Sequence, residues 1–194
     1  PPGSLANLKN LKVIFSLGAG VDHVFRDPHV PDVPIVRVVS DDLTNRMSEF
    51  IVWQVLDHHR MGPKYRQQQR DKVWFEDRSQ AAAKDITVGV MGLGVLGGDA
   101  ARKLKGVGFQ VTGWSRSAHA LEGIQTYHGA DGLAPFLSGL DMLVCLLPLT
   151  PDTAGFINES LIRQMTKRGP LGAPVIINAG RGGLQNEADI LAAL

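Results

Sequence analysis

Six short apolar segments run along the chain, separated by polar or amphipathic stretches. They lie at 11–17, 35–39, 86–92, 110–114, 141–147 and 174–179. Most are continuous apolar runs, as is typical of parallel strands buried on both faces, whereas half-buried strands alternate apolar and polar residues. Because helical patterns alternate with these segments, the sequence predicts an α/β fold with a doubly wound parallel sheet and right-handed crossovers.

One helix is predicted between the third and fourth segments. Leu96, Ala100, Leu104 and Val107 form an apolar stripe along it, and Gly108 ends it. The polar stretch 64–72, "KYRQQQRDK", is predicted to be a solvated surface or a connector.

A second helix is predicted at 44–60, with Asp41, Asp42 or Thr44 as its cap. Its middle is apolar on almost every side, through Phe50, Ile51, Val52, Trp53, Val55 and Leu56. Such a helix is covered on several sides by two domains or a second subunit, or it is an ordinary core helix. The sequence leaves these alternatives open.

Composition narrows the class of protein. With 194 residues, 44% of them hydrophobic, the chain can form one good core, or one domain plus part of another. The net charge of +1 gives no indication of nucleic acid or an anionic membrane as partner, and no apolar run approaches the length of a membrane span. Cys145, the sole cysteine, is predicted to be an inert core thiol, and no metal site is predicted.

The two ends of the sequence suggest a longer protein. It begins at Pro1 without a methionine, and "NEADILAAL" stops inside a predicted helix. There is no signal-peptide pattern, so we expect a cytoplasmic location.

A glycine motif follows the third apolar segment. Gly92, Gly94 and Gly97 form G-x-G-x-x-G between a predicted strand and a predicted helix, which is the context of a dinucleotide-binding loop. The first glycine allows a tight turn, the second lets a pyrophosphate approach the backbone, and the third lets helix and strand pack closely. The anion would lie at the helix N-terminus. The alternative is a glycine-rich turn without a ligand.

The next strand ends in "GWSRS", where a dinucleotide fold that binds NAD usually carries an acidic residue. Ser115, Arg116 and Ser117 stand there instead. A guanidinium pairs with a 2′-phosphate, hydroxyls can donate to the same oxygens, and a carboxylate would repel it. The sequence therefore predicts NADP (NADPH) as the cofactor, with NAD less favoured. The alternative is that Arg116 is merely exposed to solvent.

Two further loops follow apolar strands. "SLGAGVDHV" (16–24) offers consecutive backbone donors that can form a nest for a carboxylate or another small anion. "INAGRGG" (177–183) places Arg181 at the carboxyl end of a strand, where open α/β sheets bind ligands.

These motifs, together with "CLLPLTPDTAGFIN" (145–158), resemble in their order the D-isomer-specific 2-hydroxyacid dehydrogenases. "GWSRS" and "MSEFIVWQVLDHHR" look most like the family's glyoxylate/hydroxypyruvate reductase branch, which favours NADPH. The resemblance implies that 1–43 is part of a flavodoxin-like substrate (catalytic) domain. It further implies that 44–194 is the hinge helix and most of a Rossmann-like cofactor domain, that the protein is a homodimer, and that a small 2-keto acid is reduced to its D-2-hydroxy acid.

The resemblance also assigns roles to residues. Arg181 would be the substrate-binding and catalytic arginine, acting as a bidentate clamp that polarises the C2 carbonyl. The main-chain N–H groups of Ala19, Gly20 and Val21 would bind the substrate carboxylate. The residues expected to bind the cofactor are Gly92, Gly94, Val95, Leu96, Gly97, Trp114, Ser115, Arg116, Ser117, Leu147, Pro148, Thr153, Ala179 and Gly180.

The family's proton donor, a His partnered by a Glu, comes after the arginine motif, and we expect both beyond residue 194. None of the six histidines stands in a matching motif, so we expect the 194 residues alone to bind cofactor incompletely and not to turn over. Two other functions are weighed. One is a nucleotide-sensing, non-catalytic interaction module of the same fold. The other is a methyltransferase, which would lack its acidic ribose ligand and would leave Arg181 without a role.

Overall fold

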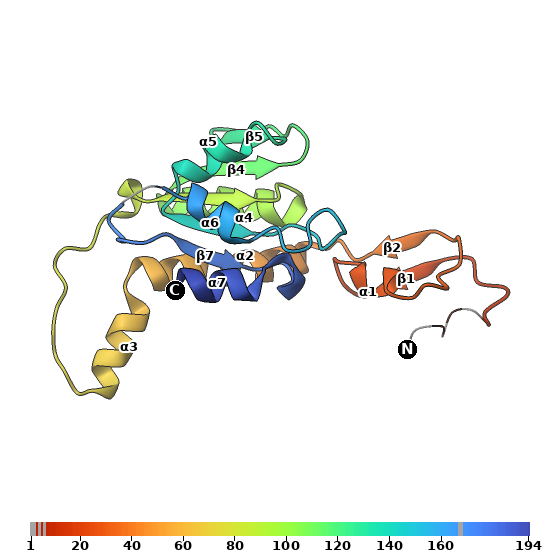
Figure 1. Cartoon of the computed structure of the whole chain (residues 1–194), viewed down its shortest axis with the longest axis horizontal. Helices are drawn as coiled ribbons and strands as arrows, with labels where there is room; N and C mark the ends of the chain where they lie inside the picture. The colour runs from red at the N-terminus through yellow and green to blue at the C-terminus, as the bar shows by residue number, and fades with distance from the viewer. Residues whose placement is uncertain (1–2, 4, 6, 167–168) are drawn as a thin grey trace.

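The computed structural model describes residues 3, 5, 7–166 and 169–194, and its centre is a five-stranded parallel sheet (Figure 1). The strand order is β5-β4-β3-β6-β7. The chain therefore runs outward from β3 on one side and, after a crossover, outward from β6 on the other. The bounds are β3 Thr87–Met91, β4 Gln110–Ser115, β5 Gln125–His128, β6 Met142–Cys145 and β7 Val175–Asn178. The predicted doubly wound parallel sheet is confirmed.

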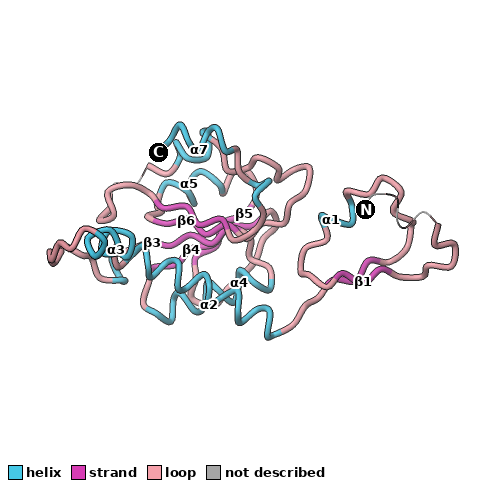
Figure 2. Tube along the Cα trace, turned by 90° about the horizontal axis from the view of Figure 1, so that it is seen from below, coloured by secondary structure: helices cyan, strands magenta, loops and turns pink. Residues whose placement is uncertain are grey.

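Helices cover both faces of this sheet. Figure 2 shows α2 and α4 on one face and α5 and α7 on the other. The helix bounds in this part of the chain are α4 Val95–Val107, α5 Leu133–Ser138, α6 Glu159–Gln164 and α7 Glu187–Ala193, with short 3₁₀ turns at Ala83–Asp85 (η1) and Gly182–Leu184 (η2). In a sheet covered on both faces the central strands bury both sides, as β3 and β6 do, which explains their continuous apolar runs.

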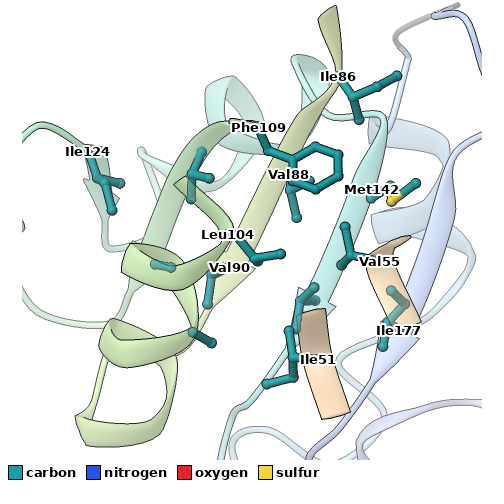
Figure 3. Packing of buried hydrophobic residues seen from close by; sticks show 14 of the residues in the cluster. Ile51, Val55, Ile86, Val88, Val90, Leu104, Phe109, Ile124, Met142 and Ile177 are labelled. Atoms are coloured by element: carbon teal, nitrogen blue, oxygen red, sulfur yellow. The ribbon is translucent and has the colours of Figure 1, made fainter. Parts of the chain in front are cut away.

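Each face of the sheet has its own buried cluster. Successive side chains of β6 alternate between them: Met142 and Val144 pack with α2 and α4, whereas Leu143 and Cys145 pack with α5 and α6. Figure 3 shows the first cluster, in which the helix residues Ile51, Val55 and Leu104 meet the strands. Burial raises the pKa of the Cys145 thiol to about 11, so the prediction of an inert core cysteine is confirmed.

The described residues before α2 form a separate small unit. β1 (Ile14–Ser16) and β2 (Ile35–Arg37) pair in parallel, and α1 (Asp22–Phe25) lies between them in sequence. This unit lies beyond one end of the five-stranded sheet, and α2 follows it in the chain (Figure 1).

Helix α2 (Asp41–His59) begins earlier than predicted, and the predicted caps are wrong. Ser40 is the N-cap, and its hydroxyl accepts a hydrogen bond from the N–H of Leu43 at 3.2 Å. Asp41 and Asp42 lie in the first turn instead, where their negative charges interact favourably with the positive end of the helix dipole.

One stripe of α2 is buried against α4 and the sheet, and the opposite side is open. The buried residues are Thr44, Ser48, Ile51, Val55 and His59. Phe50 and Trp53 are 41% and 57% exposed, so the described part of the chain leaves the second apolar side uncovered.

The other two helix predictions compare differently with the structure. The stretch 64–72, expected to be a solvated surface or a connector, lies mostly in α3 (Gly62–Arg70), a helix that buries none of its residues. It starts after Met61 in the left-handed conformation at φ 58° and carries Pro63 in its first turn. On α4, Val107 is 42% exposed, and the buried stripe consists of Gly97, Gly98, Ala100, Ala101 and Leu104. Among the described helices, none is both long and apolar enough to cross a membrane.

Candidate active site

The carboxyl ends of β3 and β6 lie side by side where the strand order reverses. Gly92 directly follows β3 at this point and packs against the chain after β6. Its N–H donates to the carbonyl of Trp114 at the end of β4, at 2.8 Å. Gly92 has φ 101°, and a Cβ there would lie 3.0 Å from the carbonyl carbon of Leu146. A side chain at this position would be strained by its backbone angle and crowded by the chain after β6. Gly92 therefore lets three strand ends converge at the point where open α/β sheets bind ligands.

The other two motif glycines have different neighbours. A Cβ on Gly97 would collide with the carbonyl oxygen of Gly92 and lie 2.9 Å from its carbonyl carbon, so helix α4 approaches β3 closely. A Cβ on Gly94 would meet no described atom within 4 Å. Packing within the described chain does not require glycine at 94, whereas access of a ligand to the backbone would. Val95 and Leu96, which follow the N-cap Gly94, bring N–H groups of the first helical turn to the same place.

The turn after β4 is held by hydrogen bonds from two buried side chains, Ser115 and Trp114. Ser115 is buried, and its hydroxyl donates to the carbonyl of Ser117 at 2.7 Å, while the indole N–H of Trp114 donates to the carbonyl of Gly129 at 2.9 Å. Arg116 and Ser117 are exposed at the surface of this turn. Ser115 thus shapes the turn, and Arg116 and Ser117 are the residues that face outward.

The loop after β6 is also held by its own side chains. The hydroxyl of Thr153 donates to the carbonyl of Pro148 at 2.6 Å and accepts from the N–H of Thr150 at 2.8 Å. A Cβ on Gly180 would lie 2.8 Å from the carbonyl oxygen of Leu147. The N–H of Ala179 donates to the carbonyl of Cys145 at 3.0 Å. The predicted residues after β6 and those after β7 therefore lie side by side.

Asn178, the last residue of β7, was not among the predicted site residues, yet it organises the arginine turn. Its amide oxygen accepts from the N–H of Gly180 at 3.1 Å, and its amide nitrogen donates to the carbonyl of Arg181 at 2.9 Å. The available signal was a polar residue at the end of a buried apolar strand.

The loop 18–21 after β1 lies next to this turn. The hydroxyl of Ser16 accepts from the N–H of Gly18 at 3.3 Å and contacts the carbonyl of Gly20 at 3.4 Å, which holds the loop in shape. No described residue accepts a hydrogen bond from the N–H groups of Ala19, Gly20 or Val21. These three donors remain available to an anion, as a nest requires.

Arg181 reaches this loop from the other end of the chain. A Cβ on Gly20 would collide with Nη2 of Arg181 and would lie 3.1 Å from its Cζ. Nε of Arg181 donates to Oδ1 of Asp22 at 3.1 Å, and Nη1 donates to the carbonyl of Gly180 at 3.1 Å. Asp22 was not predicted either. A full cation thus lies beside a loop whose three backbone donors have no described acceptor. Such a combination can bind a carboxylate and polarise a neighbouring carbonyl.

Comparison with protein families gives one match that covers most of the chain. Residues 52–194 match the family model described as D-isomer specific 2-hydroxyacid dehydrogenase, NAD binding domain.

Individual relatives agree with that match. The chain is 37% identical over 200 residues to glyoxylate/hydroxypyruvate reductase A of Yersinia enterocolitica, covering 100% of this chain and 62% of the relative. It is 56% identical, with a TM-score of 0.91, to the crystal structure of the NADPH-dependent glyoxylate/hydroxypyruvate reductase of Sinorhizobium meliloti in complex with NADP and sulfate, covering 95% of this chain and 58% of that one. A D-isomer specific 2-hydroxyacid dehydrogenase of Xanthobacter autotrophicus in complex with NADPH and MES is 40% identical with a TM-score of 0.92, covering 100% and 60%. The chain therefore spans about three fifths of the length of these relatives.

Proposed function

The chain belongs to the D-isomer specific 2-hydroxyacid dehydrogenase family, and from this premise we propose that the protein is an NADPH-dependent reductase of small 2-keto acids. The substrate would be of the glyoxylate or hydroxypyruvate type and the product the D-2-hydroxy acid. The names of the relatives support this substrate class and do not favour the nucleotide-sensing alternative.

The residues at the carboxyl ends of the strands fit a dinucleotide. No described atom lies within 4 Å of a Cβ on Gly94, so a pyrophosphate would have room at this turn. The close packing of Gly97 against Gly92 would place the N-terminus of α4 beside the bound pyrophosphate. Arg116 and Ser117 are exposed where a 2′-phosphate would lie, and no acidic residue stands in 113–117 to repel it. Solved relatives that hold NADP or NADPH support the same choice, with NAD less favoured. When bound, the cofactor would supply the hydride.

The single observation that carries the substrate proposal is the meeting of Arg181 with the loop 18–21. The N–H groups of Ala19, Gly20 and Val21 would bind the carboxylate of the keto acid. The guanidinium would lie beside the C2 carbonyl and stabilise the negative charge that develops on its oxygen as hydride arrives. Nε donates to Asp22, and Nη1 uses one of its two N–H groups on the Gly180 carbonyl. Nη2 and the second N–H of Nη1 would therefore supply the donors for the expected two-nitrogen clamp.

The remaining parts of the proposal concern organisation. Residues 1–43 would belong to the substrate domain and 44–194 to the hinge helix and cofactor domain. The exposed Phe50 and Trp53 on α2 support a homodimer, in which a second subunit would cover this side. A cytoplasmic location is part of the same proposal, in keeping with a single buried cysteine.

The cofactor proposal is tested by changing Arg116 to Asp in the complete gene product. We expect the Kd for NADPH to rise about 100-fold, since an attractive cation is replaced by a repulsive carboxylate, and the Kd for NADH to change by less than about threefold. Titration of the cofactor fluorescence measures both. Arg163→Asp makes the same charge change on α6, where the side chain is 76% exposed and paired with Glu159, and should alter neither affinity.

If Arg116→Asp weakens NADPH and NADH equally, this residue does not meet a 2′-phosphate. The substrate proposal is tested separately, because wild-type protein with NADPH must reduce glyoxylate or hydroxypyruvate. Arg181→Lys should lower kcat more than it weakens cofactor binding.

A further inference from the structure

Asp22 is the acidic residue that directly follows the anion-binding loop. Its side chain is 11% exposed, and its two oxygens have different partners. Oδ1 accepts from Nε of Arg181 at 3.1 Å, across 159 residues of sequence, and Oδ2 accepts from Nη2 of Arg26 at 3.3 Å. A carboxylate this close to a loop that is to hold another carboxylate is unfavourable unless it serves the site in another way.

The contact with Arg181 determines which edge of the guanidinium is presented. Asp22 takes Nε, and the carbonyl of Gly180 takes Nη1. No described residue accepts a hydrogen bond from Nη2, which lies against the Cα of Gly20. The plane of the guanidinium is thereby fixed, with Nη2 directed at the loop.

The charges around the loop allow this arrangement. Asp22 lies between the two cations Arg26 and Arg181, so the group of three carries a net positive charge. An incoming anion therefore still meets an attractive field, and the hydrogen bond to Nε is charge-assisted, which makes it stronger than a neutral one.

We propose that Asp22 is a positioning residue for Arg181, which holds the guanidinium through Nε so that Nη2 faces the bound keto acid. This inference rests on the proposed function for its consequence in catalysis. The same contact links residue 22 in the small β1–β2 unit to the end of β7 in the five-stranded sheet, so it also fixes the two loops relative to each other. Gly20 is required for the same arrangement, because any side chain at position 20 would displace the guanidinium of Arg181.

Asp22→Ala in the complete gene product removes the acceptor. We expect kcat/KM for glyoxylate with NADPH to fall about 100-fold, the effect of a misplacement of roughly 1 Å at a reacting centre. The Kd for NADPH should stay within about twofold, because Asp22 lies outside the proposed cofactor contacts. Asp22→Asn retains an oxygen that accepts from Nε and should restore activity to within about tenfold of wild type.

A matched control is Asp42→Ala. Asp42 also lies in the first turn of a helix and pairs with an arginine four residues later, Arg46, at 2.9 Å, yet it is 76% exposed. This variant should leave kcat, KM and the Kd for NADPH unchanged.

A second measurement does not depend on activity. In the wild type, the Nε–H proton of Arg181, assigned in NMR spectra by its loss in Arg181→Lys, should exchange slowly with solvent, and in Asp22→Ala it should exchange fast. Wild-type kcat/KM in Asp22→Ala overturns the proposal, whatever happens to its thermal stability. If that variant does not fold, fast exchange of Nε–H in the wild type overturns it. A wild-type protein that reduces neither keto acid contradicts the proposed function, and the exchange measurement still decides the contact.

Discussion

Two glycines of the same loop should respond in opposite ways to the same substitution. A methyl group on Gly97 would collide with the carbonyl oxygen of Gly92 and lie 2.9 Å from its carbonyl carbon, and both are backbone atoms, which cannot move aside as the end of a flexible side chain can. A methyl group on Gly94 would meet no described atom within 4 Å, and its φ of −68° suits alanine. Gly97→Ala therefore perturbs the fold, and Gly94→Ala perturbs the space expected to receive the pyrophosphate.

The magnitudes follow from these contacts. Forcing one methyl group into a packed backbone contact costs about 1–3 kcal/mol, so Gly97→Ala should lower the free energy of unfolding by at least that much. In Gly94→Ala, the less favourable N-cap costs about 1 kcal/mol, and the restriction of the unfolded chain returns about 0.4–1 kcal/mol. Its net stability should therefore stay within about 1 kcal/mol of wild type. If the methyl group crowds the pyrophosphate by a similar 1–3 kcal/mol, the Kd for NADPH should rise roughly 5- to 150-fold.

Urea unfolding and NADPH fluorescence titration on the same preparations separate the two effects. Gly106→Ala is the control, because this α4 position is exposed and a Cβ there meets no described atom within 4 Å. It should stabilise the protein by about 0.5–1 kcal/mol and leave NADPH affinity unchanged. A stable Gly94→Ala variant that binds NADPH like the wild type would show that the pyrophosphate does not lie over this turn. Wild-type stability in Gly97→Ala would refute the packing argument.

Two further predictions concern pH and assembly. The side chain of His59 is buried beside Phe109, and burial lowers its pKa, so the unfolded chain takes up a proton first as pH falls below about 6.5. Stability should therefore decrease from pH 6.5 downward, and His59→Leu should flatten this decrease in urea midpoints measured from pH 5 to 8. If a second subunit covers Phe50 and Trp53, Trp53→Asp should halve the mass observed by sedimentation velocity. A wild type that is monomeric at all accessible concentrations would contradict the homodimer.

The fold was largely predictable because burial on both faces leaves a strong signal in the sequence. Each of the six apolar runs coincides with a strand to within a few residues. Gly108, which follows α4, ends this helix in the left-handed conformation at φ 109°. The strand that sequence reasoning missed, β5, reads "QTYH" and lies at the edge of the sheet, where no continuous apolar run is required. The helices not predicted by range are α1, α5 and α6, which have four to six residues each, and α3, which buries none of its residues.

What holds α3 in place could not be inferred from a pattern. Arg66 pairs with Asp57 of the preceding helix through two hydrogen bonds, the longer of them 2.7 Å, and Lys64 pairs with Asp77 at 2.8 Å. The hydrogen bond from Lys64 holds the pKa of Asp77 well below its usual range. The two ion pairs join residues at different distances along the sequence. Hydrophobic periodicity cannot predict them, because it describes only the positions of apolar residues.

The candidate site also has a part that the sequence predicts and a part that it does not. The glycine loop, the turn at Arg116 and the turn at Arg181 are local motifs, so a few consecutive residues were enough to predict their chemistry. Asp22 and Asn178 contribute through partners that the fold supplies, and Asp22 meets its partner across 159 residues. Even Ser115, which stands within a predicted motif, donates its hydroxyl hydrogen bond to the carbonyl of Ser117 inside the turn.

These contacts also explain how a chain with a net charge of +1 can be built to receive three anionic groups. On the proposed function, the pyrophosphate would meet the helix N-terminus and the keto acid carboxylate would meet the loop 18–21, where backbone N–H groups supply partial positive charge without adding to the net charge. Full cations would be needed at two points, at Arg116 for the 2′-phosphate and at Arg181 beside the reacting carbonyl. The second cation is placed next to a carboxylate, Asp22, which fixes its orientation and reduces its excess charge. Selectivity would then arise from where donors point, so a single misdirected guanidinium would weaken the site more than the loss of a distant charge.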